Sequence, residues 1–235
     1  MAKTEDPIAV MKRYELKYLV SPQQAEYLKK KLEGRMQPDE YGKTSIASLY
    51  YDTTDARLVR ASLEKPLFKE KIRLRSYGPA DEKSPVFLEL KRKAFGIVYK
   101  RRIQSTIPEV NRFFDSGSGS FPGSQITREI QTFRDYYGTL VPACMIIYDR
   151  TAYFETDGDL RLTIDENPRY RMTDLGLDKS MEGISLLPEG WSVLEIKVQE
   201  AMPLWLSDIL SGGQIYKTSF SKYGEAYKRQ LLKAA

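Results

Sequence analysis

The chain of 235 residues contains no histidine and only one cysteine. The absence of histidine excludes imidazole acid–base chemistry, Ser/His and Cys/His nucleophilic pairs, and zinc sites built on histidine. Cys144 lies in the apolar run Val-Pro-Ala-Cys-Met-Ile-Ile over residues 141–147, so we expect a buried, inert thiol rather than a nucleophile. Any metal ion must then bind to carboxylates, the donors that Mg²⁺ and Mn²⁺ prefer.

Long apolar runs are missing as well. Residues 1–7, Met-Ala-Lys-Thr-Glu-Asp-Pro, lack the apolar core of a signal peptide, and no run approaches the roughly 18 residues that cross a bilayer. We therefore predict a cytoplasmic protein. Any product that it exports would need a separate membrane partner.

Charge is plentiful and slightly one-sided. Lys and Arg number 37 against 32 Asp and Glu, a formal net charge of +5, which favours anionic partners but is equally typical of an ordinary basic soluble protein. The length and the 41% hydrophobic content suffice for one domain with its own core. We expect a short tail over residues 1–12 and a single domain over residues 13–235.

The punctuation and periodicity of the sequence predict an α+β fold. N-caps, first-turn prolines and terminal glycines predict helices over 21–33, 54–64, 126–137, 203–212 and 220–233. Alternation with a period of two predicts eight mostly antiparallel strands, over 14–20, 45–51, 71–77, 86–92, 97–107, 143–154, 159–165 and 191–198. The Gly- and Ser-rich stretch 115–124 is typical of a flexible loop within the domain.

The predicted strands carry charged side chains on one face, because residues two apart share a face. These faces hold Glu15, Lys17, Lys71, Arg73, Arg75, Glu89, Lys91, Lys100, Arg102, Arg161, Asp165, Glu195 and Lys197. For a single strand, a solvent-exposed face explains such charges well. Across six strands it explains them poorly, since like charges side by side destabilise a sheet. The excess of cations indicates a bound polyanion, whose phosphate oxygens guanidinium groups bind in pairs. If the sheet closes, these faces line a tunnel.

Seven short motifs, in their order and spacing, resemble the VTC domain, the polyphosphate polymerase branch of the triphosphate tunnel metalloenzyme (CYTH-like) superfamily. They are Arg-Tyr-Glu-Leu-Lys-Tyr at 13–18, Ser-Leu-Tyr-Tyr-Asp at 48–52, Ile-Arg-Leu-Arg-Ser-Tyr-Gly at 72–78, Leu-Glu-Leu-Lys at 88–91, Asp-Arg-Thr-Ala-Tyr at 149–153, Val-Leu-Glu-Ile-Lys at 193–197 and Phe-Ser-Lys-Tyr at 220–223. The resemblance extends from about Arg13 to Tyr227. It implies an eight-stranded antiparallel tunnel, a closed barrel with packing helices, whose basic interior holds the triphosphate of ATP and a growing polyphosphate chain.

The resemblance also implies roles for individual residues. Phosphate-binding roles fall on Lys17, Arg73, Arg75, Lys91, Lys100, Arg150, Arg161 and Lys222, with Ser221 beside them. Glu195 would be the main ligand of a Mn²⁺ or Mg²⁺ ion, assisted by Glu89. Glu15 and Lys197 share the charged faces and complete the candidate site.

Two positions depart from the pattern of the family. Hydrolytic relatives begin with Glu-x-Glu-x-Lys, whereas this chain has Arg13 in place of the first Glu. This substitution favours polymerisation over two-metal hydrolysis. Polymerase relatives often carry Lys where Ser219 stands, and Lys217 is the candidate that replaces it.

Together these features predict a polyphosphate polymerase that transfers the γ-phosphoryl group of ATP to a polyphosphate chain. The triphosphate would be held by Arg73, Arg75, Lys91 and Lys100, and the acceptor chain by Arg150, Arg161 and Lys222. The alternatives are a triphosphatase or nucleotide cyclase in the same tunnel, and a non-catalytic module that binds polyphosphate or nucleic acid. Tyrosines could stack on bases, but Tyr14 and Tyr18 alternate away from the charged face, so we expect no nucleic-acid partner.

Overall fold

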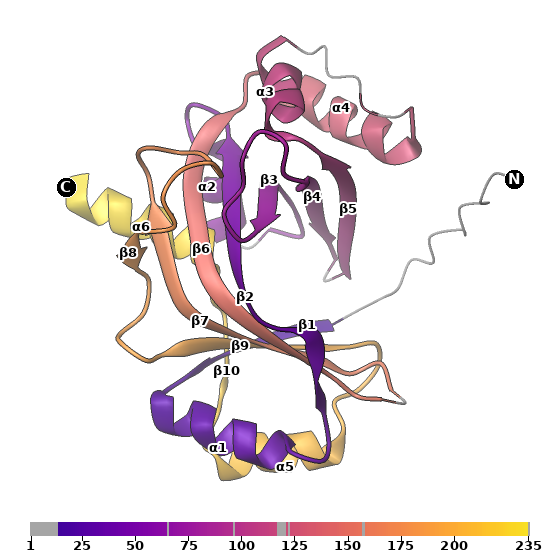
Figure 1. Ribbon diagram of the computed structural model, residues 1–235, viewed down its shortest axis with the longest axis vertical. Coiled ribbons are helices and arrows are strands. Elements are labelled where there is room, and N and C mark those ends of the chain that lie inside the picture. Colours follow the sequence, from indigo (N-terminus) through magenta and orange to yellow (C-terminus); the bar gives the residue numbers. More distant parts are fainter. Residues whose placement is uncertain are drawn as a thin grey trace, which may run out of the picture.

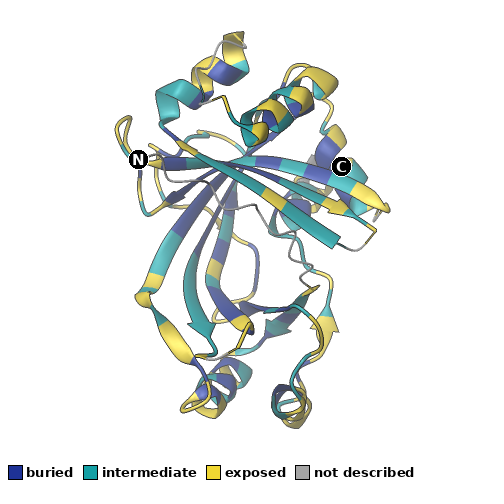
Figure 2. Ribbon diagram, turned by 90° about the vertical axis from the view of Figure 1, so that its right-hand side faces the viewer, coloured by how far each residue is buried: buried dark blue, intermediate teal, exposed yellow. Residues whose placement is uncertain are grey.

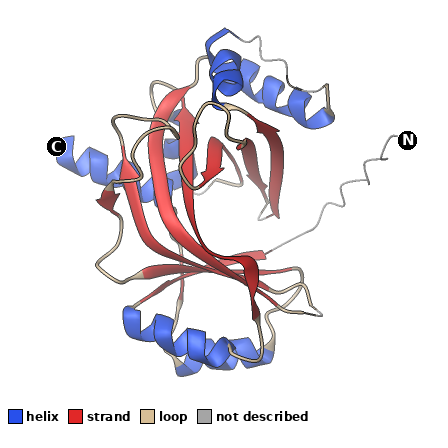
Figure 3. Ribbon diagram, viewed as in Figure 1, coloured by secondary structure: helices blue, strands red, loops and turns tan. Residues whose placement is uncertain are grey.

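The computed structural model describes residues 14–64, 66–95, 97–116, 121, 123–156 and 158–234. These residues form ten strands and six helices in an α+β fold (Figures 1 and 3). The strands are β1 (Tyr14–Val20), β2 (Gln37–Asp52), β3 (Phe68–Tyr77), β4 (Val86–Ala94), β5 (Ile97–Ser105), β6 (Val141–Phe154), β7 (Arg161–Arg171), β8 (Ile184–Ser185), β9 (Ser192–Val198) and β10 (Lys217–Thr218). The helices are α1 (Pro22–Leu32), α2 (Arg57–Leu63), α3 (Ile107–Ser116), α4 (Gln125–Tyr137), α5 (Leu204–Gly212) and α6 (Lys222–Ala234). The predicted tail, residues 1–12, lies outside the described residues.

All ten described strands belong to one antiparallel sheet, in the order β10-β1-β9-β7-β6-β2-β3-β4-β5 with β8 beside β7. The eight longer strands are those that the alternation predicts. β8 and β10 have two residues each, too few to show a periodicity. The sheet curves strongly along β2, β6 and β7 (Figure 1), yet no backbone ladder among the described residues joins β5 to β10. The described residues therefore form a curved antiparallel sheet, and the ladder that would close the predicted barrel is not detected among them.

The apolar face of the sheet is covered by two pairs of helices, which lie at opposite ends of the molecule in Figure 1. α3 and α4 bury Phe113 and Phe133 against Leu74 and its neighbours in the sheet. α1 and α5 bury a second cluster, which includes Leu28 and Ile196. Each fully buried side chain of this kind contributes roughly 1.5–3 kcal/mol. Figure 2 shows buried residues along the strands and exposed residues on the free sides of the helices. The charged residues are left on the other, concave side, called the inner face below.

The C-terminal helix α6 packs on the inner face. Tyr223 stacks on Tyr50 of β2 with 4.7 Å between ring centroids, and its hydroxyl donates a 2.7 Å hydrogen bond to Oδ2 of Asp52. Asp52 is fully buried and also accepts hydrogen bonds from the backbone N–H groups of Leu58 and Val59 in α2. One carboxylate thus joins β2, α2 and α6 and holds the segment that precedes Tyr223 against the inner face.

The helices confirm most of the predicted boundaries. α1 begins with the predicted capping box of Ser21 and Gln24. α3 was not predicted, although its first turn is capped: Oε2 of Glu109 accepts from the N–H of Thr106 at 3.0 Å and from Oγ of Ser105 at 2.8 Å. The strand alternation hides this cap because β5 runs almost directly into α3. Of the loop predicted over 115–124, residues 115 and 116 belong to α3 and Ser124 caps α4, while residues 117–120 and 122 lie outside the described residues. Among the described residues, no helix is long and apolar enough to cross a bilayer.

Asp52 is expected to be worth more to stability than an ordinary buried side chain. Asp52→Ala leaves buried N–H groups of α2 without an acceptor and should lower the free energy of unfolding by about 3 kcal/mol. Tyr223→Phe removes only one hydrogen bond and should cost about 1 kcal/mol. Urea unfolding of both variants and of the double variant checks this. The double variant should lose less than the sum; losses that add within about 0.3 kcal/mol would contradict the direct link.

Candidate anion-binding site on the inner face

The inner face gathers the charged residues of the sheet. The cations on it include Lys17, Lys71, Arg73, Arg75, Lys91, Lys100, Arg102, Arg150, Arg161, Lys197 and Lys222, and strand register places Lys69 and Lys93 on the same side. The carboxylates on it are Glu15, Glu89, Asp165 and Glu195. Strand register brings the two kinds together, because Glu89 lies opposite both Arg73 and Arg102.

Glu89 of β4 is the centre of a first cluster. Its side chain is only 1% exposed. Arg73 donates to Oε2 from Nη2 at 2.7 Å and from Nε at 2.9 Å, Lys100 Nζ lies 2.7 Å from Oε1, and Arg102 Nε donates to Oε1 at 2.7 Å. Arg75 Nε lies 3.8 Å from Oε2. Burial by itself raises the pKa of Glu89, but these cations, Arg73 foremost, lower it far below its usual value. The carboxylate is therefore ionised and holds several cations at once.

Asp165 and Glu195, on neighbouring strands, form a second cluster. Arg150 donates to both oxygens of Asp165, at 2.6 and 2.8 Å, and its Nη2 lies 3.4 Å from Oε2 of Glu195. Lys222, at the start of α6, donates to Oδ2 of Asp165 and lies 3.8 Å from Oε1 of Glu195. Burial raises the pKa of both acids, but the surrounding cations outweigh burial and lower it. Lys17 Nζ, 3.2 Å from Oε1 of Glu195, extends this cluster to β1.

Glu15 connects the two ends of the curved sheet. Its Oε1 lies 3.3 Å from Lys17 Nζ, and its Oε2 accepts a 2.9 Å hydrogen bond from Lys91 Nζ. β1 and β4 are far apart in the strand order, so the sheet must curl to bring them within reach. Burial raises the pKa of Glu15, but Lys91 and Lys17 outweigh it and lower the pKa to about 2. Side chains, rather than backbone hydrogen bonds, thus span the opening of the sheet.

Some cations on the inner face have no carboxylate of their own within the described ranges, and others share one carboxylate with several cations. Lys197 has no ion pair within 4.0 Å among the described residues, and burial lowers its pKa. For Lys100, burial lowers the pKa most, Glu89 raises it, and the nearby Arg102 and Arg75 lower it further, to about 8. Cations crowded in this way favour a ligand that brings several negative charges in a narrow space.

Two tyrosines contact the cations of both clusters. The hydroxyl of Tyr50 accepts a 2.9 Å hydrogen bond from Nη1 of Arg73. Tyr148 lies under both Arg150 and Lys222, 5.1 and 4.4 Å from its ring centroid. Neither tyrosine was among the predicted site residues. The sequence could have indicated them, because Tyr50 is two residues from Ser48 on β2 and Tyr148 is two residues from Arg150 on β6, and residues two apart on a strand share a face.

The structure places most of the predicted residues together but leaves two apart. Arg161 lies on the correct face, but it is exposed, and its contacts are to the carbonyl oxygens of residues 155 and 160 and to the ring of Phe154. Lys217 pairs with Tyr18, whose side chain enters the outer core. The pairing therefore puts Lys217 on the side of the sheet away from Lys17. Conversely, Arg102 belongs to the Glu89 cluster although it was predicted only as part of the charged face.

The surroundings of Glu195 suit a hard divalent cation. Oγ1 of Thr163, directly opposite Glu195 on β7, is buried and has no hydrogen-bond partner in the part of the chain that the structure describes. Lys17 Nζ lies 3.2 Å from Oε1 of Glu195 and 3.3 Å from Oε1 of Glu15, so these two carboxylates are close enough to share one cation, and a metal ion would compete with Lys17 for them. No group of three acidic or thiol side chains stands ready for a metal among the described residues. One or two carboxylates completed by phosphate oxygens is, however, a common way to bind Mg²⁺. Glu89 fits such a role less well, because Arg73 and Lys100 lie 2.7 Å from its oxygens, whereas the cations nearest to Glu195 lie 3.2 Å or more away.

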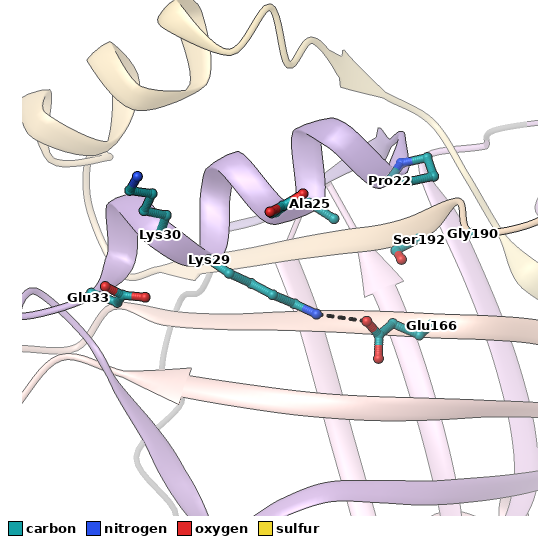
Figure 4. A pocket seen from close by; sticks show the side chains of 9 residues that line it. Pro22, Ala25, Lys29, Lys30, Glu33, Glu166, Gly190 and Ser192 are labelled. Atoms are coloured by element: carbon teal, nitrogen blue, oxygen red, sulfur yellow. Dashed lines mark hydrogen bonds and ion pairs between the residues drawn. The ribbon is translucent and has the colours of Figure 1, made fainter.

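A groove on the outer face offers no comparable site. It lies between α1 and the adjoining strands, where Lys29 donates a 2.8 Å hydrogen bond to Glu166 (Figure 4). Glu166 also pairs with Lys43 at 2.6 Å. The lysines and carboxylates here neutralise one another in partly exposed ion pairs, which are common on protein surfaces and require no ligand.

Comparison with known proteins relates the chain to a family. The VTC domain family matches residues 12–231. A candidate adenylate cyclase from Bacillus halodurans has the same fold, with a TM-score of 0.54, 16% identity, and coverage of 90% of this chain and 96% of that one. A candidate adenylyl cyclase from Hippeastrum, described as having a dominant triphosphatase activity, gives a TM-score of 0.53 at 19% identity over 91% and 93% of the two chains. Curated protein sequences give no match.

Removal of the Glu89 charge should destabilise the protein in a way that an anion repairs. Glu89→Gln leaves Arg73, Lys100 and Arg102 crowded without a counter-charge and should lower the free energy of unfolding by about 3–5 kcal/mol. Inorganic triphosphate should raise the melting temperature of this variant more than that of the parent. Glu82→Gln, the same change at an exposed position, is the control and should melt as the parent does. A Glu89→Gln variant as stable as the parent would refute the role of Glu89.

Glu15 should make stability depend on pH in acid. Its pKa is lower in the folded chain, about 2, than in the unfolded chain, about 4.5, so its contribution is present above pH 4.5 and is lost as the pH falls toward 2. The difference in unfolding free energy between the parent and Glu15→Gln should therefore narrow by roughly half from pH 5 to pH 3. Urea unfolding at several pH values measures it. A difference independent of pH would exclude the ion pair as its source.

Proposed function

We propose that this chain, which belongs to the VTC domain family, transfers the γ-phosphoryl group of ATP to the end of an inorganic polyphosphate chain bound on its inner face. The family handles triphosphates, and its superfamily consists generally of metal-dependent enzymes that act on phosphates. The observation that carries the proposal is the excess of cations over carboxylates on one concave face. Neither a solvated sheet face nor a structural ion-pair network needs such an excess.

The Glu89 cluster would hold the triphosphate. Arg73, Arg75, Lys100 and Arg102 converge on one carboxylate, which keeps their donors aligned and close. Phosphate oxygens can replace part of the contacts with Glu89, because guanidinium groups bind phosphate and carboxylate with the same paired geometry. Lys91, which the ion pair with Glu15 holds nearby, would add a further contact.

The Asp165–Glu195 cluster would hold the acceptor chain. Arg150 and Lys222 converge there, and Lys17 and Lys197 lie on the adjoining strands β1 and β9. Ser221 stands at the junction, since its Oγ accepts a 3.0 Å hydrogen bond from Lys71. Arg161, exposed at the end of β7, would contact the chain where it leaves the face.

The proposed reaction requires no covalent intermediate with the protein. The terminal phosphate of a polyphosphate chain is already ionised, so no general base has to remove a proton, in agreement with the absence of histidine. Alignment of donor and acceptor, together with neutralisation of charge, supplies most of the catalysis in phosphoryl transfer. Glu195, with the unpaired Thr163 hydroxyl and Glu15 nearby, would hold a Mn²⁺ or Mg²⁺ ion. The chemistry that such an ion would supply there is neutralisation of negative charge on the phosphate.

Hydrolysis of triphosphate is the second candidate. The similar fold of the Hippeastrum protein, described as having a dominant triphosphatase activity, favours it. The sequence Arg13-x-Glu15-x-Lys17 disfavours it, because hydrolytic relatives have a carboxylate in place of Arg13; this residue lies outside the described part of the chain. The product separates the two candidates: a polymer in one case, free phosphate in the other.

The purified full chain, given ATP and Mn²⁺, should form long polyphosphate that is visible on a gel. Arg73→Ala/Arg75→Ala should lower the rate at least about 100-fold, because preorganised donors to the transferred group are lost. Arg112→Ala/Arg128→Ala removes the same charge from exposed positions on α3 and α4 and should leave the rate unchanged. Melting temperatures verify that each variant is folded. Release of inorganic phosphate without any polymer would refute the proposal in favour of the triphosphatase.

A further inference from the structure

Lys71 of β3 is a cation that the predicted site does not include. It lies on the inner face between the two clusters, two residues before Arg73 and opposite Lys91 of β4. Its Nζ donates a 3.0 Å hydrogen bond to Oγ of Ser221. No carboxylate among the described residues lies within 4.0 Å of it. By contrast, Lys17, Lys91 and Lys100 each have a carboxylate partner.

The groups that face Lys71 are nearly all cationic. Lys69 and Arg73 flank it on its own strand, Lys91 faces it from β4 and Lys17 from β1. On the neighbouring β2, Asp52 is engaged by the backbone of α2 and by Tyr223. Glu15, the nearest acid of β1 along this path, is shared by Lys17 and Lys91. Burial, and then Lys17 and Lys91, lower the pKa of Lys71 to about 7.

We propose that Lys71, together with the hydroxyl of Ser221, contacts the bound phosphate chain directly and takes up a proton when that chain arrives. The inference rests on the proposed function, since its ligand is the triphosphate or polyphosphate of that reaction. A neutral amine limits the repulsion between Lys71 and its cationic neighbours in the free protein. Bound phosphate oxygens favour the protonated form of Lys71 instead, because negative charge then lies next to the amine.

The sign of the pH dependence follows from this change. The pKa of Lys71 is about 7 in the free protein, and bound phosphate raises it, so the bound state holds more protons. Affinity should therefore fall as the pH rises through the interval between the free and the bound pKa. Near pH 8, roughly 0.5–1 proton should be taken up by Lys71 for each ligand bound.

Calorimetric titration of the full chain with inorganic triphosphate at pH 8, with EDTA present, measures this uptake. The titration is done in two buffers of different ionisation enthalpy, which gives the number of protons bound. Lys71→Arg remains charged at this pH and Lys71→Met remains neutral, so each should take up roughly 0.5–1 proton less than the parent. Lys71→Met should also bind about tenfold more weakly at pH 7. Other groups that titrate near pH 8, such as Lys100, Lys197 and the ligand itself, are present in every variant. Their proton uptake therefore cancels when the variants are compared with the parent.

Lys30→Met, on the outer surface of α1, is the matched control and should behave as the parent does. Equal proton uptake by the parent and both Lys71 variants would overturn the inference, and so would an unchanged affinity of Lys71→Met. If the parent chain binds no triphosphate at all, the proposed function fails and this inference with it. Binding without the expected difference in uptake removes the inference alone and leaves the proposed function standing.

Discussion

Like charge held close together on the concave side of one sheet is the constraint on which this protein depends. Lys and Arg side chains from seven strands point to the same side, and their repulsion would open the sheet if nothing opposed it. Glu89, Asp165, Glu195 and Glu15 oppose it, and each is shared by two or more cations. The apolar helices on the outer face supply the remaining stability through burial.

The carboxylates have two roles. They hold the cations in place in the free protein, and they leave an excess of positive charge that a phosphate chain can neutralise. Glu15 shows this most clearly, because its contact with Lys91 joins β1 to β4, two strands that the backbone does not pair. An opening spanned by side chains can rearrange around a ligand more easily than a hydrogen-bonded ladder can.

The C-terminal segment completes the inner face from outside the sheet. Asp52 accepts a hydrogen bond from Tyr223 and so holds it in place. The two residues that precede Tyr223 then make contacts on the inner face: Ser221 with Lys71, and Lys222 with Asp165. This explains why two motifs far apart in the sequence, at 48–52 and 220–223, belong to one structural unit. The first motif supplies the anchor, and the second supplies the groups that the anchor positions.

The α+β class, the eight longer strands, most helices and the residues that share the charged face could be predicted from the amino-acid sequence, because hydrophobic periodicity and parity along a strand are local properties. The sequence did not indicate α3, whose cap follows directly after a strand, nor that no backbone ladder joins β5 to β10 among the described residues. Only the tertiary structure decided which cations meet on Glu89, that Lys217 points away, that Arg161 stands apart and that Lys71 lacks a carboxylate. These outcomes depend on strand register and curvature, which bring together side chains from distant parts of the chain.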